Sequence, residues 1–105
     1  MGEQQPTFLY LSTTGRKSGL LREIEIWFTR HGGCFYVIAE HNSSQWVQNI
    51  AANPKVKVRI REETFSGSAR ILDPATEPEL NATVQGLSRT KYGWGEGSVV
   101  EIRRE

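Results

Sequence analysis

Apolar and charged residues alternate in three separate stretches of this chain. The alternation runs through REIEIWFTR (residues 22–30), KVKVRI (residues 55–60) and SVVEIRR (residues 98–104). Successive side chains of a β-strand point to opposite faces, so a period of two predicts strands with two different environments. The tripeptide His31-Gly32-Gly33 predicts a tight turn after the first stretch, because glycine adopts positive φ without strain. Hairpins and antiparallel pairing are therefore expected to dominate the fold.

Further strands and two helices complete the expected order. Residues 7–14 and 64–72 favour strands, and residues 34–40 are almost continuously apolar. Residues 43–53 change period and predict a short helix that ends at Asn53-Pro54. Asp73-Pro74 predicts the start of a second helix, with the aspartate as its cap. The order β-β-β-α-β-β-α-β predicts a mainly β, α+β fold: a small barrel of about six antiparallel strands with two flanking helices.

Composition limits the classes of partner and compartment. A length of 105 residues predicts one domain spanning 1–105, and 13 Lys and Arg against 12 Asp and Glu give a net charge of only +1. No overall field draws such a chain to nucleic acid or to a membrane surface, and we expect neither as a partner. Cys34 is the single cysteine, which excludes an intrachain disulfide and favours a cytoplasmic location. Two histidines without ligand spacing predict no metal site.

The segment TTGRKSG (residues 13–19) places two adjacent cations between two glycines. Glycines allow consecutive backbone N–H groups to converge on an anion, and Arg16 and Lys17 add charge-assisted donors for phosphate oxygens. The spacing matches neither a Walker motif nor a dinucleotide fingerprint. A hairpin loop with solvated charges is the alternative interpretation.

A resemblance to a known family rests on this segment together with later motifs. LSTTGRKSG, the Gly-Gly hairpin, W-x-x-N-I-x-A-N-P-x-V-x-V from Trp46 onward and a late tyrosine-containing segment are similar to the deazaflavin-dependent nitroreductase family. That family belongs to the split β-barrel FMN-binding proteins, which include the pyridoxamine phosphate oxidase-like enzymes. The resemblance implies a homodimer of split barrels, with coenzyme F420 bound in a groove beside the interface. It also implies an oxidoreductase that transfers hydride to a small electrophilic organic acceptor.

The resemblance further implies which residues would form the site. The loop would hold the coenzyme phosphate, the following strand and the end of residues 34–40 would flank the ring, and the first helix would close the site. The residues expected to bind the cofactor are Thr14, Gly15, Arg16, Lys17, Ser18, Gly19, Arg22, Ile26, Trp27, Ala39, Glu40, Trp46 and Asn49. Tyr92 and His41 are the candidate catalytic residues, placed to orient an acceptor or move a proton.

Several alternatives remain open at this point. Glu23, Glu25 and the short segment EHNSS (residues 40–44) depart from the family pattern, which leaves open FMN as the cofactor or a non-catalytic protein that binds a flavin or another anionic ligand. The basic stripe at residues 55–61 has two interpretations: a nucleic-acid-binding surface, or a strand face that is simply solvated. Tyr92 could instead pack at a helix end that Gly93 terminates, and His41 could be only a hydrogen-bonding residue at a strand end.

Overall fold

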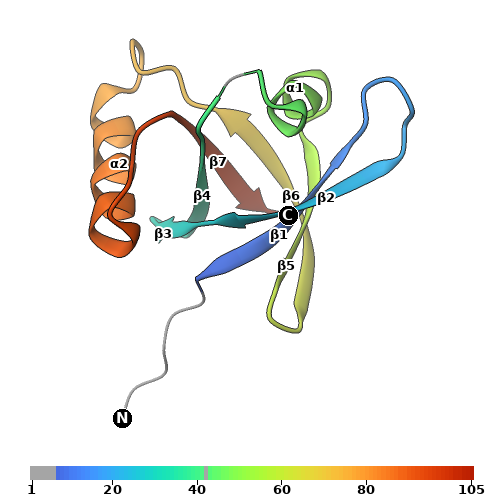
Figure 1. Ribbon diagram of the computed structural model, residues 1–105, viewed down its shortest axis with the longest axis horizontal. Helices are drawn as coiled ribbons and strands as arrows, with labels where there is room; N and C mark the ends of the chain where they lie inside the picture. The colour runs from blue at the N-terminus through green and yellow to red at the C-terminus, as the bar shows by residue number, and fades with distance from the viewer. Residues whose placement is uncertain (1–6, 42) are drawn as a thin grey trace.

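The computed structural model describes residues 7–41 and 43–105, and these form seven strands and two helices. Their bounds are β1 Phe8–Thr14, β2 Leu21–Trp27, β3 Thr29–His31, β4 Cys34–Ala39, α1 Gln45–Ala52, β5 Lys55–Ile60, β6 Glu63–Ile71, α2 Pro78–Tyr92 and β7 Ser98–Arg104. All neighbouring strands pair antiparallel, in the order β2-β1-β5-β6-β7-β4-β3. The predicted mainly β fold with two helices is confirmed (Figure 1).

A single residue, Phe28, connects the two edge strands of the sheet. β2 and β3 lie at its two opposite edges, yet only Phe28 separates them in the chain. The two edges must therefore meet where the chain passes from one to the other, and the sheet curls into a split barrel. The prediction of one continuous strand over 22–30 was wrong: the apolar alternation continues through Phe28, but that residue turns the chain between the two edges.

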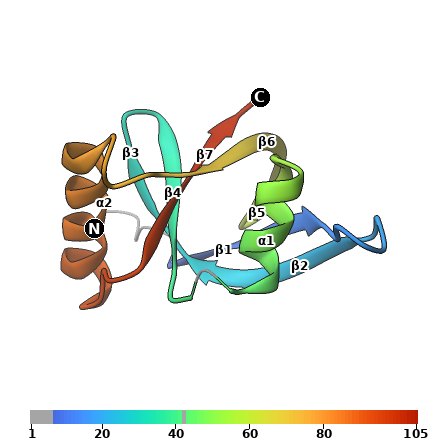
Figure 2. The ribbon, with the colours of Figure 1, turned by 90° about the horizontal axis from the view of Figure 1, so that it is seen from above.

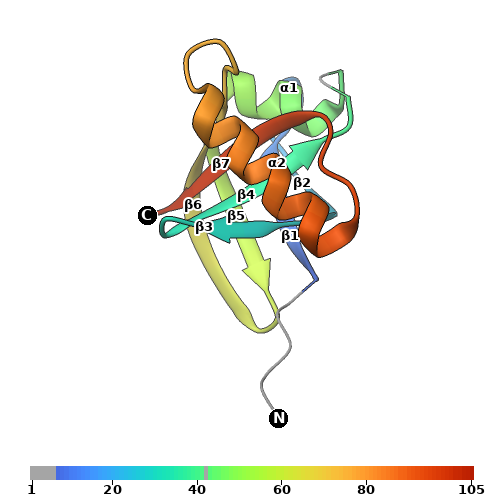
Figure 3. The ribbon, with the colours of Figure 1, turned by 90° about the vertical axis from the view of Figure 1, so that its left-hand side faces the viewer.

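The two helices cover different parts of the barrel. α1 lies against β1 and β6, whereas α2 lies against β3 and β7 (Figures 2 and 3). The predicted start of the second helix at Asp73 was wrong. The carboxylate of Asp73 accepts a hydrogen bond from the backbone N–H of Ala75 at 2.9 Å, so this residue forms a turn and the helix begins at Pro78. Proline suits the first turn of a helix, where its missing N–H costs nothing.

The buried apolar side chains form two clusters. The larger fills the barrel and consists of Leu9, Leu11, Phe28, Phe35, Val37, Ile50, Val56, Val58, Phe65, Ala69, Val100 and Ile102. The smaller lies under α2 and consists of Tyr36, Ile38, Leu72, Val84 and Val99. The alternation of each strand thus divides its residues between the barrel interior and a second surface, as a period of two requires.

A buried carboxylate fastens α2 to the sheet. Glu101 on β7 is 2% exposed, and it accepts hydrogen bonds from the Tyr36 hydroxyl at 2.8 Å and from Arg70 Nε at 2.9 Å. Arg70 also donates through Nη1 and Nη2 to Glu77, the residue that precedes α2. Arg70 and Tyr36 face Glu101 on its two neighbouring strands, so strand register alone brings the three side chains together.

Candidate functional site

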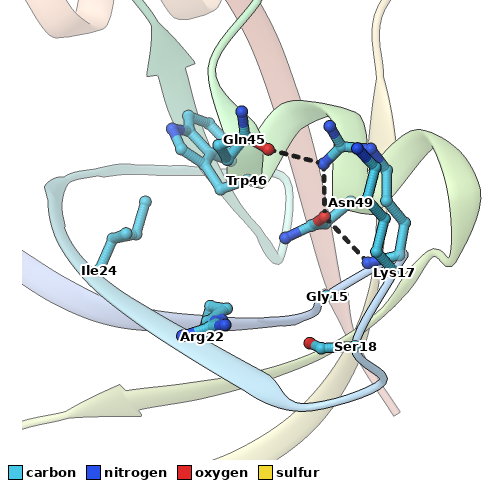
Figure 4. Close-up of a pocket in the computed structure, with 9 residues that line it drawn as sticks. Gly15, Lys17, Ser18, Arg22, Ile24, Gln45, Trp46 and Asn49 are labelled. Carbon is cyan, nitrogen blue, oxygen red and sulfur yellow. Dashed lines mark hydrogen bonds between the residues drawn. The ribbon is translucent and has the colours of Figure 1, made fainter.

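An open cleft of about 420 Å³ lies between the β1–β2 loop, the first half of β2 and helix α1. Figure 4 shows Lys17 and Ser18 at the loop end of the cleft, with Ile24 and Trp46 toward its other end. The lining residues are Gly15, Arg16, Lys17, Ser18, Arg22, Ile24, Gln45, Trp46 and Asn49. The loop that the sequence singled out is thus one wall of a cavity.

The loop has a defined backbone conformation. The Gly15 N–H donates to the Leu20 carbonyl at 2.7 Å, and the Gly19 N–H donates to the Gly15 carbonyl at 2.8 Å. The Ser18 hydroxyl oxygen accepts from the Leu20 N–H at 3.2 Å. A Cβ at position 15 would lie 2.6 Å from Ser18 Oγ, so a side chain there would disturb this arrangement. Gly19 has φ +73°, which explains the second glycine.

Asn49 holds the loop against α1. Its Oδ1 accepts hydrogen bonds from the backbone N–H of Arg16 at 3.2 Å and from Arg16 Nη1 at 2.9 Å. Its Nδ2 donates to the Thr13 hydroxyl at 3.1 Å, and Gln45 Oε1 accepts a second bond from Arg16 Nη1 at 2.9 Å. Asn49 is only 3% exposed, so a buried amide ties together the end of β1, the loop and the helix.

The cleft has the donor set of an anion site with an apolar extension. Arg16, Lys17 and Arg22 are cationic, and none of the nine described residues that line the cleft is acidic. The Arg16 guanidinium, held by Gln45 and Asn49, and the Lys17 ammonium are both suited to phosphate oxygens. Ile24 and half-buried Trp46 add apolar surface beyond the cations. An elongated ligand with a phosphate at one end and a flat apolar group at the other fits this distribution.

The structure brings together part of the predicted cofactor set. Gly15, Arg16, Lys17, Ser18, Arg22, Trp46 and Asn49 line the cleft, whereas Thr14, Gly19, Ile26, Trp27, Ala39 and Glu40 do not. Thr14 lines a different hollow beside Lys55, on the other face of the sheet. Ile26 packs against the barrel core, and Ala39 is buried at the end of β4.

The two carboxylates that depart from the family pattern point away from the cleft. Arg22 and Ile24 line it, so Glu23 and Glu25 project from the opposite face of β2. There Glu25 accepts a hydrogen bond from the Tyr10 hydroxyl at 3.2 Å, and Glu23 lies 3.8 Å from Arg59. These acids therefore place no negative charge among the residues that line the cleft.

Tyr92 lies outside the cleft, where α2 ends. Its hydroxyl oxygen accepts a hydrogen bond from the Phe28 N–H at 3.0 Å and contacts the carbonyl oxygens of Phe28 and Thr7. Its ring stacks on Trp27 with centroids 4.6 Å apart. Burial raises the pKa of Tyr92, although the backbone hydrogen bond from Phe28 opposes this rise. Gly93, with φ +78°, ends the helix directly after it.

The other candidate catalytic residue is also outside the cleft. His41 and Glu40 follow β4, and their side chains are 72% and 75% exposed. His41 Nε2 lies 3.9 Å from Glu40 Oε1, an ion pair only when the histidine is protonated. Asn42, which follows them in the EHNSS segment, lies outside the described residues.

The sequence interpretation missed Ile24, Gln45 and Thr13. Ile24 is two residues after Arg22 and shares its strand face, and Gln45 precedes Asn49 by four residues on one helix face. Both follow from the residues that were predicted, once the face of each element is known. Thr13 is buried two residues before Gly15, where the loop begins, and its hydroxyl accepts a hydrogen bond from Asn49.

Comparison with known proteins identifies the family of this chain. Residues 1–94 match the family model described as F420H(2)-dependent quinone reductase. The chain belongs to this family. The resemblance to deazaflavin-dependent reductases is thereby confirmed. The protein is 29% identical over 73 residues to the F420H(2)-dependent quinone reductase of Mycobacterium tuberculosis, an alignment that covers 66% of this chain and 49% of that one. It thus spans about half the length of the curated relatives it matches.

Solved structures confirm the split-barrel fold of this family member. An F420-H2 dependent reductase, FDR-A, superposes with a TM-score of 0.72 and 22% identity, covering 94% of each chain. HutZ, the heme storage protein from Vibrio cholerae, gives a TM-score of 0.79 with 17% identity, covering 96% of this chain and 83% of that one. At these identities the likeness concerns the fold.

The described residues include neither a membrane-spanning helix nor a cluster of metal-ligating side chains. None of their helices has the length and apolar character needed to span a bilayer. Nor do they bring three or more His, Cys, Asp or Glu side chains together as a metal site would require.

Proposed function

We propose that this protein is an F420-dependent oxidoreductase that reduces a small electrophilic acceptor of the quinone class. The observation that carries the proposal is the cleft itself. Two cations on its glycine-bracketed loop and a third on β2 line it with no acid, in a chain of the F420H(2)-dependent quinone reductase family. We infer the acceptor class from the relatives, which are named as quinone reductases, and the position of the coenzyme from the cleft.

The loop binds the coenzyme's phosphate in this proposal. Lys17 and Ser18 contact the phosphate oxygens, and Arg22 provides a further charge from the facing strand. Arg16 holds the loop in shape, because its Nη1 already bonds to Gln45 and Asn49. The binding energy of the phosphate end then orients the rest of the molecule along the cleft.

Ile24 and Trp46 flank the ring end and restrict water there. When bound, the reduced coenzyme supplies a hydride, and the acceptor takes up that hydride with a proton. The overall transfer would balance with the proton that the reduced coenzyme releases along with its hydride, and no Asp, Glu, His or Tyr is among the described residues that line the cleft. The protein's contribution is to position donor and acceptor rather than to exchange protons itself.

We also propose that the protein forms a homodimer of single-domain barrels. The family resemblance implies a dimer, and a structural relative with a TM-score of 0.72 and 21% identity is described as a domain-swapped dimer.

The first experiment is a fluorescence titration of the purified protein with coenzyme F420 and, in parallel, with FMN. We expect saturable binding of F420. Lys17→Ala should weaken it by about 1.5–3 kcal/mol, roughly tenfold to a hundredfold, because one charge-assisted bond is lost. Lys55→Ala is the matched control, since this exposed lysine lies outside the cleft and should leave affinity unchanged.

The second measurement follows oxidation of the reduced coenzyme in the presence of a soluble quinone. Turnover that Lys17→Ala impairs would support the full proposal. F420 binding without turnover on any quinone would leave a deazaflavin-binding protein. Tight binding of FMN with no binding of F420 would overturn the cofactor assignment.

A further inference from the structure

The face of the β2–β1–β5 ribbon that turns away from the cleft carries its charges in columns. On β2 this face holds Glu23 and Glu25, both exposed. On β5 it holds Lys57 and Arg59, and β1 lies between the two strands. Strand register sets these residues in rows, because Ser12 pairs with Glu23 and with Lys57, and Tyr10 pairs with Glu25 and with Arg59. An acidic column on β2 and a basic column on β5 thus run parallel with β1 between them, and within the chain Arg59 lies 3.8 Å from Glu23 across β1.

Apolar side chains stand at both ends of the acidic column. Trp27 and Leu21, the terminal residues of β2, are 47% and 54% exposed. Trp27 pairs with Phe8 across β1, and Phe8 is itself 39% exposed. Large apolar groups exposed together on one strand face are typical of an interaction surface.

Hollows lie on the basic side, at the same two levels along the strands. One, of about 330 Å³, is lined by Thr7, Phe8, Tyr10, Arg59 and Arg61, near the Trp27 end. The other, of about 300 Å³, lies near the Leu21 end and includes Lys55 and Gly67 in its lining. Leu21 itself lines the second hollow and Phe8 lines the first, so an exposed apolar side chain and a recess lie next to each other at both ends of this face.

A twofold axis makes this face complementary to itself. Consider a twofold axis that runs parallel to β1, between two copies whose outer faces meet. It places β2 of each copy over β5 of the other, and each row of paired residues lies opposite the same row of the second copy. Glu25 then faces Arg59 of the second copy. The exposed edge of Trp27, whose ring stacks on Tyr92 of its own chain, faces the level of the hollow of about 330 Å³. An axis across the strands would instead place acid over acid.

We propose that this outer face of β2, β1 and β5 is the contact between two copies of the chain, with β2 of each copy seated on β5 of the other. The inference rests on the homodimer of the proposed function and assigns the surface that forms it. Because β2 borders the cleft on its other face, this strand lies between the second copy and the coenzyme site.

Charge reversal across the axis tests the assignment. The twofold axis produces two copies of the contact between positions 25 and 59. In Glu25→Lys, both contacts place a lysine against Arg59, and in Arg59→Glu both place two acids together. We expect each single variant to raise the dimer dissociation constant by about tenfold or more, measured by sedimentation equilibrium. An equimolar mixture of the two variants should dimerise again, since lysine then faces glutamate and arginine faces glutamate. Pairing within one chain cannot produce this rescue.

Glu79→Lys on the exposed face of α2 is the matched control and should dimerise as the wild type does. A mixture that stays monomeric while the wild type is dimeric would overturn the surface. So would two single variants that both remain dimeric, although the homodimer itself would then stand. A monomeric wild type would overturn both, and F420 titration of the same sample would still report separately on the cleft. If the monomer bound a single-stranded oligonucleotide through Arg59, the surface would belong to nucleic acid and the dimer contact would be overturned.

Discussion

Asn49 accepts two hydrogen bonds from Arg16, one from its backbone N–H at 3.2 Å and one from its guanidinium at 2.9 Å. One amide oxygen thereby fixes both the position of the loop and the direction of its first cation. Because Asn49 is buried and its amide nitrogen is bonded to Thr13, the loop is held by the core rather than by solvent-exposed contacts. The cleft is therefore preorganised from α1.

Asn49→Ala should lower both stability and coenzyme affinity. The substitution leaves the buried Thr13 hydroxyl and the Arg16 N–H without their partner, which costs about 1–3 kcal/mol in the free energy of unfolding. Urea denaturation and F420 titration measure the two effects. Gln45→Ala is the comparison, since it removes one exposed bond to the same guanidinium and should cost less stability. Equal losses for both variants would contradict the central role of Asn49.

Two glycines should respond in opposite directions to alanine. A Cβ at Gly67 on β6 would lie 2.7 Å from the Arg103 carbonyl oxygen on β7, so Gly67→Ala must push two paired strands apart. We expect a loss of about 1–3 kcal/mol. Gly86 lies within α2 with nothing within 4 Å of the added carbon, and Gly86→Ala should stabilise by about 0.5–1 kcal/mol. Thermal unfolding of both variants would show the contrast, and a destabilising Gly86→Ala would refute this account.

The alternation predicted the strands well because it records burial directly, but it could not reveal the break at Phe28. That residue continues the apolar phase of Ile24 and Ile26, so the change from one sheet edge to the other has no local signal. The helix start was missed for a related reason. Asp73-Pro74 and Glu77-Pro78 are both an acidic residue followed by proline, a pattern typical of a helix start. The second begins the helix, and what distinguishes it is the pair of hydrogen bonds from Arg70 to Glu77, which the sequence does not show.

In the candidate site, too, local motifs could be predicted from the sequence and long-range contacts could not. Arg16, Lys17 and Ser18 are contiguous, and the family motif linked them to Trp46 and Asn49, so sequence could predict these five lining residues. Tyr92 could not be placed from sequence, since the partners of its hydroxyl are backbone groups of distant residues. Long-range contacts of this kind leave no spacing pattern in the chain.

Tyr92→Phe should reduce stability and leave catalysis intact. The Phe28 N–H loses its acceptor where β2 passes into β3, and we expect a cost of about 1–3 kcal/mol in urea denaturation. Tyr10→Phe removes an exposed hydroxyl bonded to Glu25 and should cost less. Turnover of the reduced coenzyme with a quinone should be unchanged by Tyr92→Phe below its unfolding transition. A stable variant with impaired turnover would instead restore the catalytic interpretation of this tyrosine.

Glu101 should make stability depend on acid pH. Burial alone would raise the pKa of this carboxyl, but the hydrogen bonds from Arg70 and Tyr36 outweigh burial and lower it. The folded protein therefore binds fewer protons than the unfolded chain between the two pKa values, and protonation favours unfolding there. The stabilisation is complete above the unfolded pKa of about 4.3 and is lost as the pH falls through the lower, folded value. Urea denaturation at a series of pH values should show this slope.

Glu101→Gln should be less stable at neutral pH by about 1–3 kcal/mol, because the bonds to Arg70 lose their charge, and its stability should fall less steeply below pH of about 4. Parallel curves for the two proteins would show that other carboxyls, among them Glu77, account for the acid dependence.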